Sequence, residues 1–160
     1  MKLTLDCKRR HLPFETRAMI ERLFRFTVDH LGISNYAAEV CVTVLPERVA
    51  MKNLGHGTFM ASGELGGCSP DMRGSTVDVV LFPPCEASIP WTLAHELTHA
   101  AQMLRGDLRG AGEGRTWWRG QEYRRPRSVT EYEANPWEIE ARATEKIVTK
   151  FLEAENRRNR

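Results

Sequence analysis

The pentapeptide His-Glu-Leu-Thr-His at residues 95–99 combines three side chains that can do chemistry at a zinc ion. Residues four apart lie on one face of an α-helix, so His95 and His99 can bind one metal through their imidazole nitrogens. Glu96 can then act as a general base toward a water molecule held by that metal. The motif indicates the centre of a zinc hydrolase. The alternative is a pair of inert core histidines, which is costly because two imidazoles and a carboxylate would be buried together.

A helix is predicted to carry this motif from Ile89 to Leu104. Apolar residues recur along it with helical spacing, Pro90 suits its first turn, and Gly106 provides a stop signal. The helix would therefore hold both imidazoles on a buried face.

The third metal ligand is expected to be a carboxylate, because a catalytic zinc has three protein ligands and no histidine follows His99. Glu138 is preferred, since it lies in the first turn of a helix predicted from Asn135 to about Ala154. Glu140 is the competitor, but two residues along a helix rotate a side chain by roughly 200°, so only one of the pair can face the metal. Weaker candidates are Asp107, Glu131 and Glu133.

The combination of residues 95–99 with Trp-Glu-Ile-Glu-Ala at 137–141 resembles the gluzincin type of zinc metallopeptidase. In that family two motif histidines and a glutamate from a following helix hold the metal. Residues 118–120 and 132–141 also look like those of small metallopeptidases encoded by phages and bacteria. The similarity is specific between His95 and Ala141 and only architectural before Ile89.

The resemblance implies an α+β fold: a minimal zincin-like domain in which a small mixed or antiparallel sheet packs on the active-site helix and on a C-terminal glutamate helix. Length favours one domain over residues 1–160. One catalytic Zn²⁺ is expected, held by His95, His99 and Glu138.

The chain departs from related patterns at three positions. Several gluzincins have an aspartate four residues after the ligand glutamate that supports the first histidine, whereas this chain has Arg142 there. The support of the first histidine, and with it the choice between Glu138 and Glu140, therefore stays open. Gln102 and Arg105 replace the glycine and third histidine of the longer H-E-x-x-H-x-x-G-x-x-H pattern. Kinship with SprT-like proteases, which normally use a third histidine, is disfavoured.

The expected activity is hydrolysis of peptide bonds in peptides or proteins by a zinc-activated water. Tyr132, close in sequence to the glutamate helix, is the candidate donor to the tetrahedral oxyanion; packing of its ring is the alternative. Two other functions stay open. One is a non-catalytic zincin-fold binding module, against which the intact Glu96 argues. The other is a peptidase tethered to nucleic-acid-associated proteins.

Composition is ordinary for a soluble globular protein, with 41% hydrophobic residues, 28% charged residues and a net charge of +2. No apolar run approaches the roughly 20 residues of a membrane span, and the first residues lack a signal peptide's apolar stretch. A cytoplasmic location is expected. The four cysteines are widely spaced and expected to be reduced, with Cys68 in a loop.

Two basic clusters, at residues 124–127 and 157–160, could contact phosphates. Neither is interleaved with aromatic residues in a recognisable nucleic-acid-binding motif, so nucleic-acid contact is disfavoured. Residues 154–160 are expected to form a frayed basic tail.

The other predicted elements follow from hydrophobic patterns. A helix is expected at 13–31, strands at 39–45, 58–62 and 75–82, and a hairpin or covering loop at 116–123. Asp78 lies amid apolar residues, which is typical of an edge strand to which a substrate peptide could add. A buried strand is the alternative.

Overall fold

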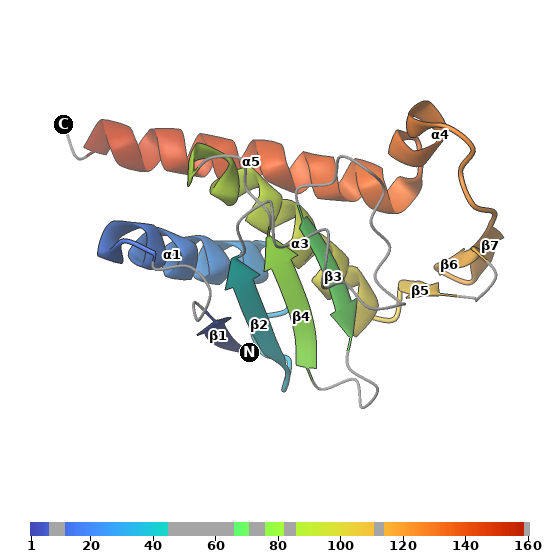
Figure 1. Ribbon diagram of the computed structural model, residues 1–160, viewed down its shortest axis with the longest axis horizontal. Helices are drawn as coiled ribbons and strands as arrows, with labels where there is room; N and C mark the ends of the chain where they lie inside the picture. Colours follow the sequence, from blue (N-terminus) through green and yellow to red (C-terminus); the bar gives the residue numbers. More distant parts are fainter. Residues whose placement is uncertain (7–11, 45–65, 71–75, 82–85, 111–113, 159–160) are drawn as a thin grey trace.

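The computed structural model describes residues 1–6, 12–44, 66–70, 76–81, 86–110 and 114–158. They form an α+β fold, as the sequence predicts, and contain two small sheets where the sequence predicted one. Figure 1 shows α1, α3 and α5 gathered beside a four-stranded sheet, with a three-stranded sheet at the far end of the molecule. The helices are α1 (Phe14–His30), α3 (Ile89–Leu104), α4 (Val129–Glu133) and α5 (Pro136–Arg158), with a 3₁₀ turn at Glu86–Ser88. The predicted strand at 58–62 lies outside the described residues.

The larger sheet has the strand order β1-β2-β4-β3. Its strands are β1 (Lys2–Asp6), β2 (Glu39–Val44), β3 (Gly66–Pro70) and β4 (Thr76–Leu81), and only β3 runs antiparallel to its neighbour. Burial alternates along β2 and β4, so one face of the sheet enters the core. The buried side chains of that face are Val40, Val42, Val44, Val77, Val79 and Leu81.

The expectation of an edge strand at 75–82 is wrong. β4 pairs with β2 on one side and with β3 on the other, so it lies inside the sheet. Asp78 is exposed because it points to the face opposite the core, where a polar side chain costs little. An exposed Asp78 between buried valines shows that one face of β4 is polar, but it does not show whether β4 lies at the edge of the sheet.

Two strands of the larger sheet were not predicted, and neither was β5 (Leu108–Gly110) of the smaller one. Cys68, expected in a loop, belongs to β3 and pairs with Val79. β1 pairs in parallel with β2, a long-range contact that no local pattern reveals. β1 therefore depends on tertiary pairing, whereas β3 pairs with the strand that follows it in the chain.

The long helices enclose the core against the sheet. α3 has the predicted bounds, and its buried Leu93 and Leu97 belong to one cluster with residues of α1 and the sheet. Gly32 follows α1 with a φ of +69°, a conformation that favours glycine and ends the helix.

The predicted frayed tail is wrong for residues 154–158, because α5 continues to Arg158. The Phe151 ring stacks on Phe26 of α1 with their centroids 4.0 Å apart, and Glu155 lies 3.8 Å from Arg22. These contacts with α1 stabilise the last turns of α5.

The hairpin prediction at 116–123 is confirmed. β6 (Thr116–Trp118) and β7 (Gln121–Tyr123) pair antiparallel, and β5 (Leu108–Gly110) adds to β6. Arg119 and Gly120 connect β6 and β7 with φ values of 47° and 82°, the left-handed pair that a two-residue hairpin turn needs. Trp137 of α5 packs against Trp118 and Tyr123, with ring centroids 6.1 and 5.2 Å away. The small sheet thus covers the beginning of α5.

No helix in the described part of the chain is both long and apolar enough to cross a bilayer.

Candidate metal centre

Two histidines and one glutamate converge where α3 crosses the first turn of α5. The Nε2 atoms of His95 and His99 lie 3.0 Å apart. Each is 3.3 Å from one oxygen of the Glu138 carboxylate, Oε2 for His95 and Oε1 for His99. One ligand atom from each of the three residues lies within 4.8 Å of the others, so the set could hold one metal ion.

Hydrogen bonds to Nδ1 orient both imidazole rings. His95 Nδ1 lies 2.6 Å from Glu145 Oε1, and a carboxylate oxygen accepts, so Nδ1 donates. His99 Nδ1 lies 2.9 Å from Gln102 Oε1. The amide nitrogen of Gln102 donates to the Trp137 carbonyl, at 3.0 Å, which leaves its oxygen to accept from His99. Both histidines therefore direct Nε2 toward Glu138.

This donor set suits a zinc ion. With both Nδ1 atoms donating, two nitrogen lone pairs and two carboxylate oxygens face the same small volume, where they repel one another unless a positive charge joins them. Glu138 Oε2 is buried and, within the described residues, has no hydrogen-bond partner. Zinc bonds nitrogen and oxygen at about 2.0–2.2 Å, which puts tetrahedral ligand atoms about 3.3 Å apart. The separations of 3.0 and 3.3 Å are close to that value.

The electrostatics of the metal-free protein show the same demand for positive charge. Burial alone would lower the pKa of His95, but the Glu138 and Glu145 carboxylates raise it from its ordinary value of 6.5 to about 10. Burial likewise opposes protonation of His99, and Glu138 outweighs it, so the pKa of His99 is raised. For Glu138, burial would raise the pKa, and the two imidazoles hold it well below its usual range. The raised pKa values of the two imidazoles mean that protonation would offset the Glu138 charge when no metal is bound.

Glu96 is buried beside the three converging residues. It is 6% exposed and projects from α3 between the two histidines in sequence. Burial raises the pKa of Glu96, while the positive charge of His99 and His95 acts in the opposite direction. A carboxylate with a raised pKa is a stronger proton acceptor, as a general base requires.

Tyr132 also reaches this centre. It is half-buried on α4, and its hydroxyl lies within hydrogen-bonding reach of the Glu138 carboxylate, which contributes to the lowered pKa of Glu138. The structure therefore brings Tyr132 to the predicted site, where its partner is the Glu138 carboxylate. Its role as an oxyanion donor stays a prediction.

Glu140 lies on a different side of α5 from Glu138. Its carboxylate accepts from Gln102 Nε2 at 3.1 Å and from Arg105 at 2.9 Å, and it does not join the histidines. Gln102 and Arg105, noted in the sequence only as replacements, thus bind Glu140.

The weaker candidates also lie elsewhere. Asp107 pairs with Arg105, Glu131 accepts from the backbone of Arg127, and Glu133 pairs with Arg142. Arg142 therefore does not support His95. The carboxylate that supports His95 is that of Glu145.

Sequence reasoning missed Glu145 and the role of Gln102. Glu145 is seven residues after Glu138, two helical turns, so both carboxylates lie on one face of α5. That spacing is the signal that could have found it. Gln102 lies one turn after His99, and its orientation depends on the Trp137 carbonyl, which only the packed structure supplies.

Replacement of Glu145 by glutamine is expected to weaken zinc binding by about 10–100-fold, because a neutral amide orients His95 less firmly than a carboxylate. Competition with a chromophoric chelator measures this change. Glu153→Gln, an exposed site on the same helix, is the matched control and should leave affinity unaltered. Equal affinity in the Glu145 variant would show that the hydrogen bond does not support metal binding.

Comparisons with protein-family models, curated proteins and solved structures found no match for this chain. The chemistry of the centre is therefore inferred from its own residues.

Proposed function

We propose that this chain is a zinc-dependent peptidase. The observation that carries the proposal is the convergence of His95, His99 and Glu138, with buried Glu96 beside them. A purely structural zinc needs no general base, and its site is closed by four protein ligands. Three converging donors and a neighbouring carboxylate instead suit catalysis, which argues against a non-catalytic binding module.

His95, His99 and Glu138 would hold the metal. Zinc supplies a Lewis acid there, which lowers the pKa of a water molecule toward neutrality and polarises a peptide carbonyl. The Glu96 carboxylate accepts a proton from the attacking water and donates it to the amine nitrogen as the C–N bond breaks. We assign Tyr132 as the donor to the developing oxyanion.

Several further assignments belong to this proposal. The chain would be a gluzincin-like member of the zincins, one domain over residues 1–160, acting in the cytoplasm on peptides or proteins. The fold is compatible with it, since the antiparallel β3 and the helix α3 are in contact and α3 contacts α5.

The proposal is tested by metal analysis and proteolysis of the same preparation. The untreated protein is expected to contain about one zinc per chain and to cleave an unfolded protein such as reduced casein. A chelator should remove the zinc and abolish cleavage, and added zinc should restore the metal content and the cleavage. Bound zinc without cleavage of any denatured protein or peptide library would contradict the proposed activity and leave the metal site standing.

Zinc binding is expected to release at least one proton at pH 7–9. The metal-free protein holds a proton on His95 up to its pKa of about 10, and the pKa of His99 is also raised, so zinc must displace protons from both imidazoles. Affinity should therefore rise by about tenfold or more per pH unit below the pKa of His95 and level off above it. The proton on His95 stabilises the metal-free fold below the ordinary pKa of 6.5, and this contribution is lost as pH rises through 10.

Calorimetry in buffers of different ionisation enthalpy counts the released protons. A buffer-independent heat at neutral pH would mean that His95 is already deprotonated before zinc binds.

A further inference from the structure

The small sheet and the segment after it are strongly basic. Residues 108–127 contain six arginines, two glutamates and no lysine, although the whole chain carries a net charge of only +2. The basic cluster at 124–127 therefore continues a charged region that already covers the sheet.

Most of this charge is not neutralised within the molecule. Arg115 pairs with Glu122 at 3.2 Å, and Arg119 pairs with Asp107 at 3.6 Å. The remaining four arginines are exposed, and their side chains make no ion pair within the described part of the chain; they are Arg109, Arg124, Arg125 and Arg127.

An exposed indole lies beside one of these arginines. Trp117 is 41% exposed and, in the register of the sheet, stands between Arg109 and Glu122. Cross-strand partners project from the same face, so Trp117 and Arg109 share one surface. Arg109 and Trp117 are eight residues apart in the sequence, and strand pairing places them side by side.

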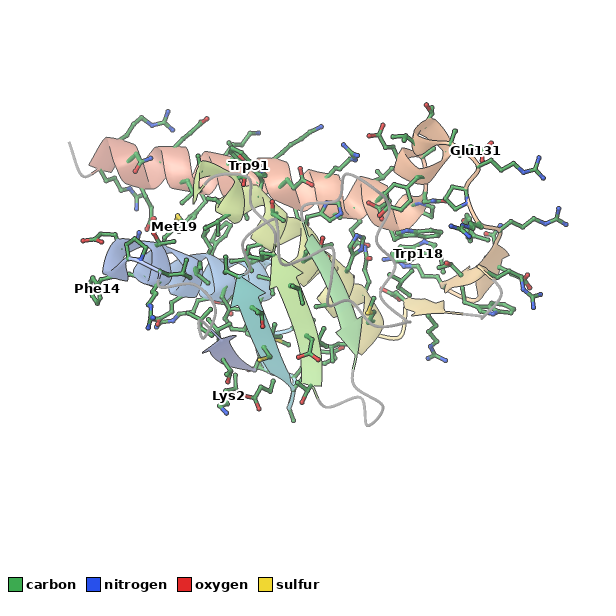
Figure 2. All side chains as sticks on the ribbon, viewed as in Figure 1. Lys2, Phe14, Met19, Trp91, Trp118 and Glu131 are labelled. Atoms are coloured by element: carbon green, nitrogen blue, oxygen red, sulfur yellow. The ribbon has the colours of Figure 1, made fainter. Side chains whose placement is uncertain are left out.

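The opposite face of the sheet is fixed to α5. Trp118, which is 6% exposed, and Tyr123 pack on Trp137, as described above. The aliphatic part of the Arg125 side chain lies over Gly114. A Cβ atom at position 114 would be only 3.2 Å from Arg125 Cδ. Figure 2 shows nitrogen-tipped side chains projecting from this end of the molecule, around the labelled Trp118 and Glu131. The basic surface is therefore presented by an anchored element.

We propose that this surface binds single-stranded nucleic acid. We call it the arginine surface and define it by Arg109, Trp117, Arg124, Arg125 and Arg127. Arginine forks bind phosphate oxygens in pairs, and an exposed indole gives an unpaired base a stacking platform. An acidic protein would use the charges but has no general need for the indole.

The test is fluorescence anisotropy with labelled oligothymidine of about 20 nucleotides at several salt concentrations. The triple variant Arg124→Ala, Arg125→Ala, Arg127→Ala is expected to bind at least tenfold more weakly in about 0.1 M salt. Its slope of log affinity against log salt should fall by about 2, since each phosphate contact contributes about 0.7. The matched control is Arg17→Ala, Lys146→Ala, Lys150→Ala, which removes the same charge from exposed sites outside both basic clusters and should change neither quantity.

Trp117→Ala separates stacking from charge. It should weaken binding by about tenfold with an unchanged salt slope, and Trp117→Phe should restore most of the affinity. The proposal is overturned if the wild-type protein does not bind oligothymidine, or if both triple variants are equally weakened. Tighter binding to polyglutamate, or to phosphatidylserine vesicles, would also overturn it and assign the surface to an acidic protein or a membrane. Because these readouts are binding constants, they are independent of peptidase activity.

Discussion

Glutamine in place of Glu96 is expected to lower kcat for peptide hydrolysis by about 10²–10⁴-fold while the protein keeps its zinc. Glutamine has nearly the same shape as glutamate, so the buried packing around residue 96, which is 6% exposed, is preserved. The amide cannot accept a proton from water or return one to the leaving amine. Because Glu96 is not among the converging donors, metal affinity should hardly change.

This prediction is checked by measuring kcat and zinc content on the same samples. Glu131→Gln, an exposed site on α4, is the control for loss of a negative charge near the centre. An active Glu96 variant would remove the general base from the mechanism. Loss of zinc together with activity would instead make Glu96 a residue of the metal site.

Alanine in place of Glu138 is expected to weaken zinc binding by more than about a hundredfold. It removes one of three ligands, whereas loss of a residue that only orients a ligand typically costs about 10–100-fold. The difference can be read from thermal unfolding. At zinc concentrations about a hundred times the wild-type Kd, zinc should stabilise the wild type by about 2.7 kcal/mol and a hundredfold weaker variant by only about 0.4 kcal/mol.

Glu140→Ala is the informative comparison, since both residues lie in the first turns of α5. Its carboxylate contacts Gln102 and Arg105, so we expect a smaller loss of affinity, transmitted through the orientation of His99. If Glu140→Ala released the metal and Glu138→Ala retained it, the assignment of the third ligand would be wrong, and a zinc centre on α3 would survive.

Local signals predicted the elements that carry the site. The spacing of apolar residues gave α3 its bounds, and the rotation between residues 138 and 140 allowed only one of them to face the two histidines. Both features depend on a few neighbouring residues and on the period of the helix.

Long-range packing decided what the sequence left open. β1 exists through pairing with the distant β2, and Asp78 marked a face of β4 that was mistaken for a sheet edge. The spacing from Glu138 places Glu145 on the same face of α5, but its contact with His95 also requires the two helices to meet at a given register.

The unbroken course of α5 has a mechanical consequence. Glu138 near its start and Phe151 near its end lie on one continuous helix, so the two residues move together. At 1.5 Å per residue they are about 20 Å apart. A change in the stacking of Phe151 on Phe26 would tilt α5 and move the Glu138 carboxylate near the other end of the helix. If the packing of Phe151 on Phe26 changes the affinity for the metal, metal binding must change the stability of that packing by the same free energy. The aromatic contact would then adjust metal affinity from a distance.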